Sequence, residues 1–249
     1  GRRVWRKKRS SPVRRHCGSR RTFGRLARRP EDPGALNDLA LVYLRQGRTR
    51  EAVEALRGAL GFDPELADAQ NNLGGALLAL GDRTGAEEAY RNAIRVQPDL
   101  TGAQKNLAGL LAAHEDFLEA GYFYRRAIRS APSDADAHYD FALALARRER
   151  FREAADEFKA AVALDPGHAE AHSGLGDMLG LMGNPSQAIR HYERAIAEKP
   201  GLSAAYLGAG SALAALGQRS AAIRRLEQAA GSSDPAVRQA ARNAIEALR

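Results

Sequence analysis

Apolar residues recur along the chain at helical spacing, in pairs of segments separated by a short break. In residues 67–100, Leu73, Leu77 and Leu80 lie four and three positions apart, and a second run of this kind follows Gly81. Such spacing places side chains on one face of an α-helix. Gly81 can end the first helix because glycine readily adopts the left-handed conformation. The pattern therefore predicts a helical hairpin in this stretch.

The hairpin is one unit of a repeat with a step of 34 residues. Prolines close the units at Pro30, Pro64, Pro98, Pro132, Pro166 and Pro200. One alanine column runs through Ala52, Ala86, Ala120, Ala154, Ala188 and Ala222, and a bulky column through Leu56, Tyr90, Tyr124, Phe158, Tyr192 and Leu226. Small side chains let helix backbones approach closely, and bulky ones fill the space beside them. A lone hairpin cannot bury its apolar face, so the units should stack on one another.

These columns and the 34-residue step resemble the tetratricopeptide repeat. The resemblance covers six units, residues 33–66, 67–100, 101–134, 135–168, 169–202 and 203–236. It implies an all-α fold over residues 30–249, a right-handed α-solenoid of stacked antiparallel helical hairpins. Two units depart from the pattern, because Glu115 and Glu149 replace the glycine of the turn. This favours looser turns, but the stacking of neighbouring units is expected to hold them.

A further helix is predicted over residues 235–248, after the sixth unit. Val237, Ala241 and Ile245 lie on one apolar stripe, and Ser233 or Asp234 can cap the N-terminus of the helix. Terminal repeats need a helix of this kind to cover their exposed apolar face.

Residues 1–29 contain thirteen Arg or Lys and no acid, whereas the other 220 residues carry 25 bases and 30 acids, a net charge of −5. Like charges and little apolar surface predict disorder here, with residues 21–29 interpreted as the remnant of a preceding helix. One hypothesis is an arm that binds nucleic acid or an anionic surface. A solvated tail is favoured over it, because Trp5 alone offers little base stacking. The single cysteine, Cys17, excludes an intrachain disulfide.

The resemblance implies that the first helices of the units line a concave binding face. Asn72 and Asn106 share a column with Asp38 and Asp140, and asparagine both donates and accepts, so such a ladder could bind an extended peptide backbone. The alternative is an ordinary polar helix face, on which Ser173 would also be exposed. The predicted peptide-binding residues are Asp38, Asp68, Asn71, Asn72, Lys105, Asn106, Asp136, Tyr139, Asp140, Arg147 and Asp177.

Charge on this face favours a neutral to basic partner, since its six acids, with Glu170 among them, outnumber its bases Arg45, Lys105 and Arg147. Residues 1–29 could therefore bind the same face, in their own chain or in a neighbouring one. The surplus of acid argues against a clamp for a peptide's carboxylate.

The histidines raise the hypothesis of a metal site, because His168 and His172 lie four residues apart. No cysteine or third ligand is near them in the sequence, so packing is the favoured interpretation and neither a metal nor a cofactor is expected. His114 and His191 are predicted to be surface residues.

The leading function is therefore a non-enzymatic adaptor that binds an extended peptide or a partner's helix. No Gly-rich phosphate loop or nucleophile turn is present. The alternatives are a targeting or substrate-recruiting segment of a larger enzyme such as a glycosyltransferase, and nucleic-acid binding through the basic arm. The resemblance, with the Ala-, Arg- and Gly-rich usage, implies a bacterial protein, and bacterial relatives of this appearance often serve the assembly of envelope or secretion machinery. The sequence contains no run of 18 apolar residues, so no membrane span is predicted in it. The compartment, cytoplasmic or periplasmic, stays open, since an anchor or signal upstream of Gly1 is not ruled out.

Overall fold

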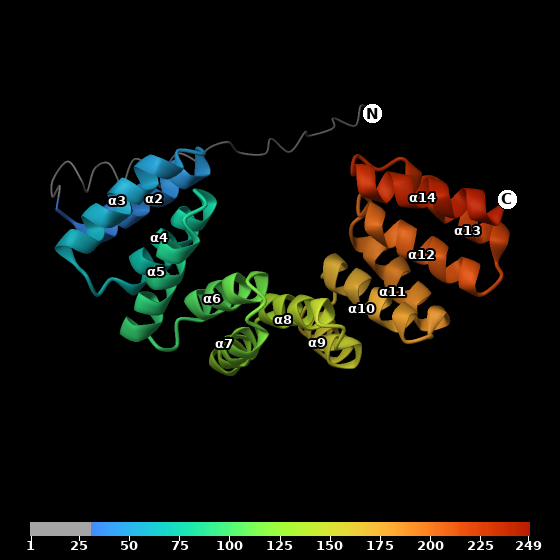
Figure 1. Cartoon of the computed structure of the whole chain (residues 1–249), viewed down its shortest axis with the longest axis horizontal. Helices are drawn as coiled ribbons and strands as arrows, with labels where there is room; N and C mark the ends of the chain where they lie inside the picture. The colour runs from blue at the N-terminus through green and yellow to red at the C-terminus, as the bar shows by residue number, and fades with distance from the viewer. Residues whose placement is uncertain (1–30) are drawn as a thin grey trace, which may run out of the picture. The chain divides into compact units, whose positions relative to one another are not determined.

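The computed structural model describes residues 31–249, and the regular structure in that part of the chain is α-helical (Figure 1). The basic segment 1–29 and the predicted helical remnant at 21–29 lie outside the described residues. The chain divides into two compact units, Gly1–Leu110 and Leu111–Arg249. The helices are α2 (Pro33–Arg45), α3 (Thr49–Phe62), α4 (Ala67–Ala79), α5 (Arg83–Val96), α6 (Thr101–Ala113), α7 (Phe117–Ser130), α8 (Ala135–Arg147), α9 (Phe151–Leu164), α10 (Ala169–Leu181), α11 (Pro185–Glu198), α12 (Ser203–Ala215), α13 (Arg219–Ala230) and α14 (Pro235–Leu248).

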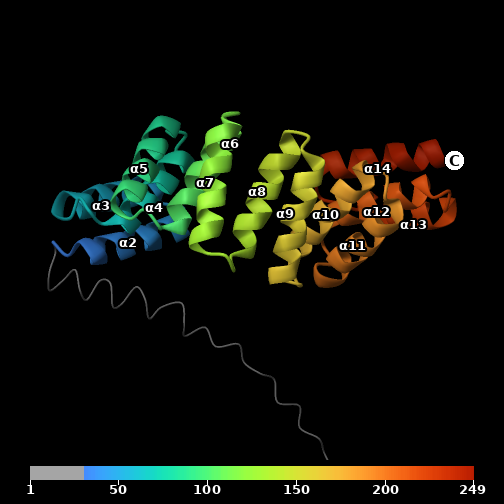
Figure 2. The same cartoon turned by 90° about the horizontal axis from the view of Figure 1, so that it is seen from below.

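Successive helices pack in pairs, as the two periodic runs of each repeat predict. In the first compact unit the pairs are α2 with α3 and α4 with α5, and α3 packs on α4. In the second they are α8 with α9, α10 with α11 and α12 with α13, and each pair also contacts the next (Figure 2). The expected all-α fold of stacked helical hairpins is confirmed.

Close contacts between an aromatic ring and a glycine hold the two helices of a hairpin together. In the first compact unit, a Cβ atom added to Gly74 on α4 would lie 2.5 Å from the ring of Tyr90 on α5. That distance is shorter than any allowed carbon–carbon contact, so only glycine fits there. Tyr90 itself is 2% exposed, and burial raises the pKa of its hydroxyl.

The same contact joins neighbouring hairpins in the second compact unit. The ring of Tyr192 on α11 lies against Gly176 of its own hairpin and against Gly208 of the next, where an added Cβ would approach to 2.7 Å and 2.5 Å. Phe158 on α9 occupies the equivalent place against Gly174 on α10. One ring therefore fixes the spacing of three helices.

The turns within the hairpins share one conformation. Gly47, Gly81, Gly183 and Gly217 have φ between 72° and 85°. Glu115 and Glu149 adopt φ of 64° and 57°, so these turns are as regular as the others, in agreement with the expectation that stacking holds them. The residue after each one donates its N–H five residues back, Asp116 to Leu111 at 3.0 Å and Arg150 to Leu145 at 3.1 Å. Asp82 bonds Leu77 in the same way at 3.0 Å, so packing of the hairpin imposes the turn on a residue type that disfavours it.

The C-terminal helix α14 forms where the sequence predicts it. Asp234 is the capping residue, since its carboxylate accepts the N–H of Ala236 at 2.8 Å, and Pro235 follows at the first helical position. Ala241 and Ile245 are buried against the preceding hairpin. No helix within residues 31–249 is long and apolar enough to cross a membrane.

Two glycines of the first repeat provide a test of the turn argument. Gly47 has a left-handed backbone and Gly61 lies within α3, and an added Cβ would meet nothing within 4 Å at either position. Gly47→Ala should therefore lower the free energy of unfolding by about 1 kcal/mol, because alanine disfavours the left-handed backbone conformation and meets no steric clash. Gly61→Ala should raise it by up to about 1 kcal/mol through reduced backbone entropy of the unfolded chain. Urea unfolding measures both, and two changes of the same sign would contradict the argument.

Candidate peptide-binding surface

The predicted peptide-binding residues all lie on first helices of the hairpins, and none of them is buried. Asp68, Asn106, Asp136, Arg147 and Asp177 are exposed, and the other six are partly exposed. The expectation that Ser173 is exposed is wrong, since it is only 7% exposed. The sequence thus predicted correctly which of these positions on the first helices are not buried, except at Ser173 on α10.

Asparagine amides link the first helices of consecutive repeats. Asn72 on α4 donates its amide N–H to the side-chain oxygen of Asn37 on α2 at 2.9 Å. Asn106 on α6 donates in the same way to Asn71 on α4, again at 2.9 Å. Both bonds join residues 35 positions apart, which is one repeat plus one residue. The polar column therefore forms a ladder of hydrogen bonds between repeats.

This ladder leaves part of each amide available to a ligand. An asparagine side chain has two N–H donors and an oxygen with two lone pairs. The bond from Asn72 to Asn37 uses one donor of the first residue and one lone pair of the second. The remaining groups are held in fixed orientations at the surface, which suits recognition of a peptide backbone.

The column changes character in the fifth and sixth repeats. Its residues there are Gly174 and Gly208, and the rings of Phe158 and Tyr192 fill the space that an asparagine side chain would need. These first helices therefore lack the amides of the earlier repeats, and the rings that replace them are buried.

Tyr192 also orients one of the predicted acids. Its hydroxyl donates to the carboxylate of Asp177 on α10 at 2.7 Å. Partial removal of the Asp177 carboxylate from water raises its pKa above the ordinary value, and the hydrogen bond from Tyr192 opposes that rise. Desolvation, with the nearby charge of Asp177, raises the pKa of the Tyr192 hydroxyl as well. The pair was missed in the sequence, because the two residues lie 15 positions apart on different helices.

A second polar cluster surrounds Asp136 on α8. His168 Nε2 lies 3.4 Å from the Asp136 carboxylate, and Lys199 Nζ lies 2.6 Å from Glu170. The hydrogen bond from Lys199 lowers the pKa of Glu170. These four residues, with Asp165 and Glu198, border a cavity of about 370 Å³. Lys199 follows the end of α11, a second helix, so the periodicity of the first helices did not predict its part in this cluster.

The histidines pair with each other and with the backbone. His172 Nε2 lies 3.2 Å from the carbonyl oxygen of Pro166, so this nitrogen carries the proton. Its Nδ1 then accepts the proton of His191 Nδ1, 3.1 Å away. His191 is partly exposed, and its ring stacks on that of His172 with centroids 5.3 Å apart, a contact that the prediction of a surface residue did not include. Within the described part of the chain, no three His, Cys, Asp or Glu residues are placed to hold a metal ion.

Comparison with known proteins identifies the repeat. A family profile described as tetratricopeptide repeat matches residues 20–67, 71–135 and 139–203, and a second profile with this description matches residues 181–245. A search of curated proteins gave no match.

Solved structures with stacked helical hairpins match over most of the chain. The APC/C hetero-tetramer Cut9-Hcn1 superposes with a TM-score of 0.76 at 14% identity, covering 93% of this chain and 45% of that one, so this chain spans less than half of its length. PilW, a type IV pilus biogenesis factor, gives 0.74 at 20% identity, covering 83% and 97%. YrrB, a protein of the same repeat type with an unusual peptide-binding site, gives 0.57 at 22% identity, covering 74% and 95%. At these identities the likeness is one of fold.

The His172–His191 pair predicts a pH dependence of stability. Burial lowers the pKa of both rings below the ordinary 6.5, and each is also lowered by cationic neighbours. The charged or titratable groups that act on the pair are Lys159, His168, Arg190, Arg194 and Glu198. At a pH above the ordinary histidine pKa, the two rings are neutral in both the folded and the unfolded chain, and they do not reduce the free energy of unfolding. As the pH falls below that pKa, the unfolded chain binds protons first, so the free energy of unfolding decreases.

Replacement of His191 by glutamine should reduce this loss. Urea unfolding at about pH 7.5 and about pH 5 would measure it, a range above the titration of carboxylates. His114→Gln is the control, because His114 is exposed. An equal loss of stability in wild type and His191→Gln would refute the role of the pair.

Proposed function

Because the chain belongs to the tetratricopeptide repeat family, we propose that it is a non-enzymatic adaptor that binds an extended segment of a partner protein on its first helices. Domains of this family bind proteins or peptides. A peptide-binding site in the similar YrrB structure supports the class of ligand. The residues of this chain supply the particular surface.

The asparagine ladder is the observation that carries the proposal. Its two hydrogen bonds, Asn72 to Asn37 and Asn106 to Asn71, have the same length and the same separation along the chain. Amide groups fixed in this way do not lose side-chain freedom when a ligand binds, which lowers the entropic cost of association. An extended peptide presents alternating N–H and C=O groups, and each asparagine retains capacity for both.

Charge supports a neutral to basic partner. On α8 and α10, Asp136, Asp140, Glu170 and Asp177 are the acids of the predicted surface, and Arg147 is its base. The ion pair of Lys199 with Glu170 offsets one of these acids and leaves a surplus of negative charge. Such a surplus raises the association rate of a cationic segment and disfavours an anionic one.

A combined substitution of Asn72, Asn106, Tyr139 and Asp140 by alanine tests the surface. Affinity capture with quantitative mass spectrometry should show proteins bound by the wild type depleted about tenfold or more, equivalent to about 1.4 kcal/mol. Urea unfolding accompanies the experiment, because loss of each ladder bond costs about 1 kcal/mol. The comparison is valid only at a temperature where the variant is folded.

The matched control places four alanines on second helices, at Glu54, Glu88, Arg129 and Asp156, which are all exposed. This variant should bind as the wild type does. Partners retained by the first variant, or lost equally from both, would refute a binding surface on the first helices.

The basic segment 1–29 provides a further prediction, because it carries thirteen positive charges and no acid. If this segment binds the acidic first helices, its deletion should raise the affinity for a lysine-rich peptide. Isothermal titration at low and high salt measures the change, which should shrink as salt screens the charges. Unchanged affinity after deletion would contradict such self-association, without bearing on the partner surface.

A further inference from the structure

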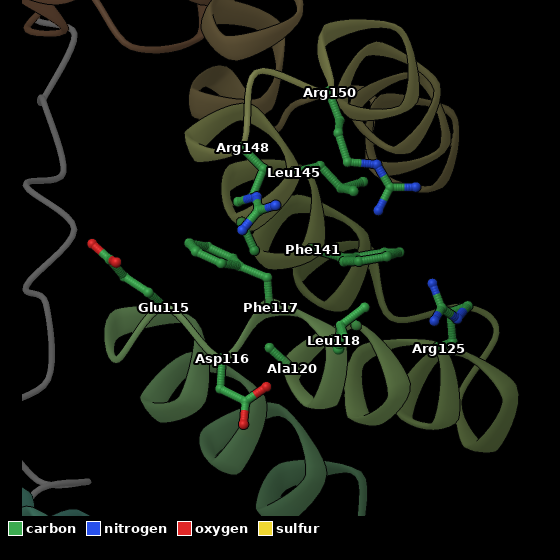
Figure 3. A pocket seen from close by; sticks show the side chains of 12 residues that line it. Glu115, Asp116, Phe117, Leu118, Ala120, Arg125, Phe141, Leu145, Arg148 and Arg150 are labelled. Carbon is green, nitrogen blue, oxygen red and sulfur yellow. The ribbon is translucent and has the colours of Figure 1, made fainter.

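A cavity of about 340 Å³ lies between α7 and α8, and its lining residues include none of the predicted peptide-binding residues. The first half of α7 and the second half of α8 form its walls (Figure 3). The side chains of Phe117, Leu118, Phe141 and Leu145 surround the space, and Arg125, Arg148 and Arg150 stand at its edges. The cavity is therefore apolar inside and cationic at the rim. Its volume is at the lower end of that of ligand sites.

A missing side chain at Gly121 creates part of this space. The equivalent positions of the other repeats carry Val53, Glu87, Ala155, Ile189 and Ile223. A Cβ atom added to Gly121 would meet the guanidinium group of Arg125 at 3.6 Å, an ordinary contact. The backbone thus accepts a side chain at this position, and glycine leaves room that the fold does not require.

Gly121 also offers Arg125 no acid, unlike Glu87 in the second repeat, which is the one acid at this position among the six repeats. In the second repeat, Arg91 forms an ion pair at 2.9 Å with Glu87, four residues before it. Four residues before Arg125 stands Gly121 instead. The guanidinium group of Arg125 lies 5.8 Å from the ring centre of Phe141. The guanidinium group of Arg148 lies 4.9 Å from the ring centre of Phe117. Among residues 31–249, neither Arg125 nor Arg148 forms an ion pair.

The acids beside the cavity do not neutralise these arginines. Asp116 accepts the N–H of Glu119 at 3.3 Å and caps α7, and Glu115 points away from the two rings (Figure 3). Glu153 pairs with Arg150, which lies at one edge. Two exposed cations therefore face a shared apolar space, each over an aromatic ring.

Apolar surface continues outside the cavity along α7. Leu118 is 90% exposed, whereas the other repeats carry Arg50, Thr84, Arg152, Ser186 and Ser220 at its position. Tyr122, one helical turn further on, is 50% exposed. A ligand confined to the cavity would leave both uncovered. A longer chain that continues along α7 would cover them.

We infer that the space between α7 and α8 is a second docking site, which binds an acidic segment of a partner protein carrying an aromatic or large aliphatic residue. The apolar side chain enters the space that Gly121 leaves, between Phe117 and Phe141. Carboxylates on either side of it pair with Arg125 and Arg148. The basic segment 1–29 of this chain is excluded as an occupant by its charge.

Fluorescence anisotropy with labelled peptides and the full chain tests the inference. The peptide GDEFLDEG should bind, with an affinity that falls as salt rises, and GKKFLKKG and GDESSDEG should bind much more weakly. Gly121→Ile fills the space with the residue found at Ile189 and Ile223, so it should keep or raise thermal stability and weaken binding about tenfold or more.

Charge reversal gives an independent arm. Arg125→Glu with Arg148→Glu should abolish binding of GDEFLDEG and permit binding of GKKFLKKG. Arg91→Glu is the matched control, since it occupies the same place in the second repeat, and it should leave binding unchanged. Binding of GDEFLDEG that survives Gly121→Ile and the reversal, equal binding of all three peptides, or no binding at millimolar peptide would overturn the inference. A further outcome would also overturn the inference: the chain binds phosphatidylserine-containing vesicles but not the peptide, and the charge reversal abolishes vesicle binding. The site would then recognise a membrane surface.

Discussion

The contact between a large side chain of a second helix and a glycine or alanine of a first helix is the interaction on which each repeat depends. Tyr90 meets Gly74, Tyr192 meets Gly176, and Leu226 lies so close to Gly210 that an added Cβ would be 2.6 Å away. Because this contact fixes how far a first helix can rotate, it also decides which of its residues face solvent. The polar residues of the first helices are presented outward as a consequence of packing on the opposite side.

Packing and recognition meet in the asparagine ladder. Its bonds join residues 35 positions apart, because a side chain on one first helix reaches the position one residue earlier in the preceding repeat. The same amides thus join the first helices of consecutive repeats and belong to the surface that we propose for a partner. A ligand that uses their remaining donors and acceptors meets groups already in place, so binding requires no rearrangement of the contacts between repeats.

Sequence periodicity was sufficient for the helices, the stacking and the capping helix, because these depend on residue types that recur every 34 positions. It was insufficient where a contact depends on rotamers or on loops. Lys199 reaches Glu170 from beyond the end of α11, and the half-buried His191 pairs with His172 on the neighbouring helix. At Glu115 the residue type disfavours the turn, and the expectation that stacking holds it agrees with the φ of 64°. The exposed placement of the predicted binding residues followed from the helical period, whereas the partners of Asp136 and Asp177 did not.

Departures from the repeat carry the specificity that a regular array lacks. If every repeat were identical, a peptide could bind in several registers shifted by one repeat, with equal energy. Gly121 breaks that equivalence, because it removes a side chain and opens a space beside Arg125 in one repeat alone among the six. The acidic first helices and this basic, apolar space have opposite preferences for charge. If both proposed sites bind as inferred, a ligand suited to one would be repelled by the other, and the chain would engage two chemically distinct segments without competition between them.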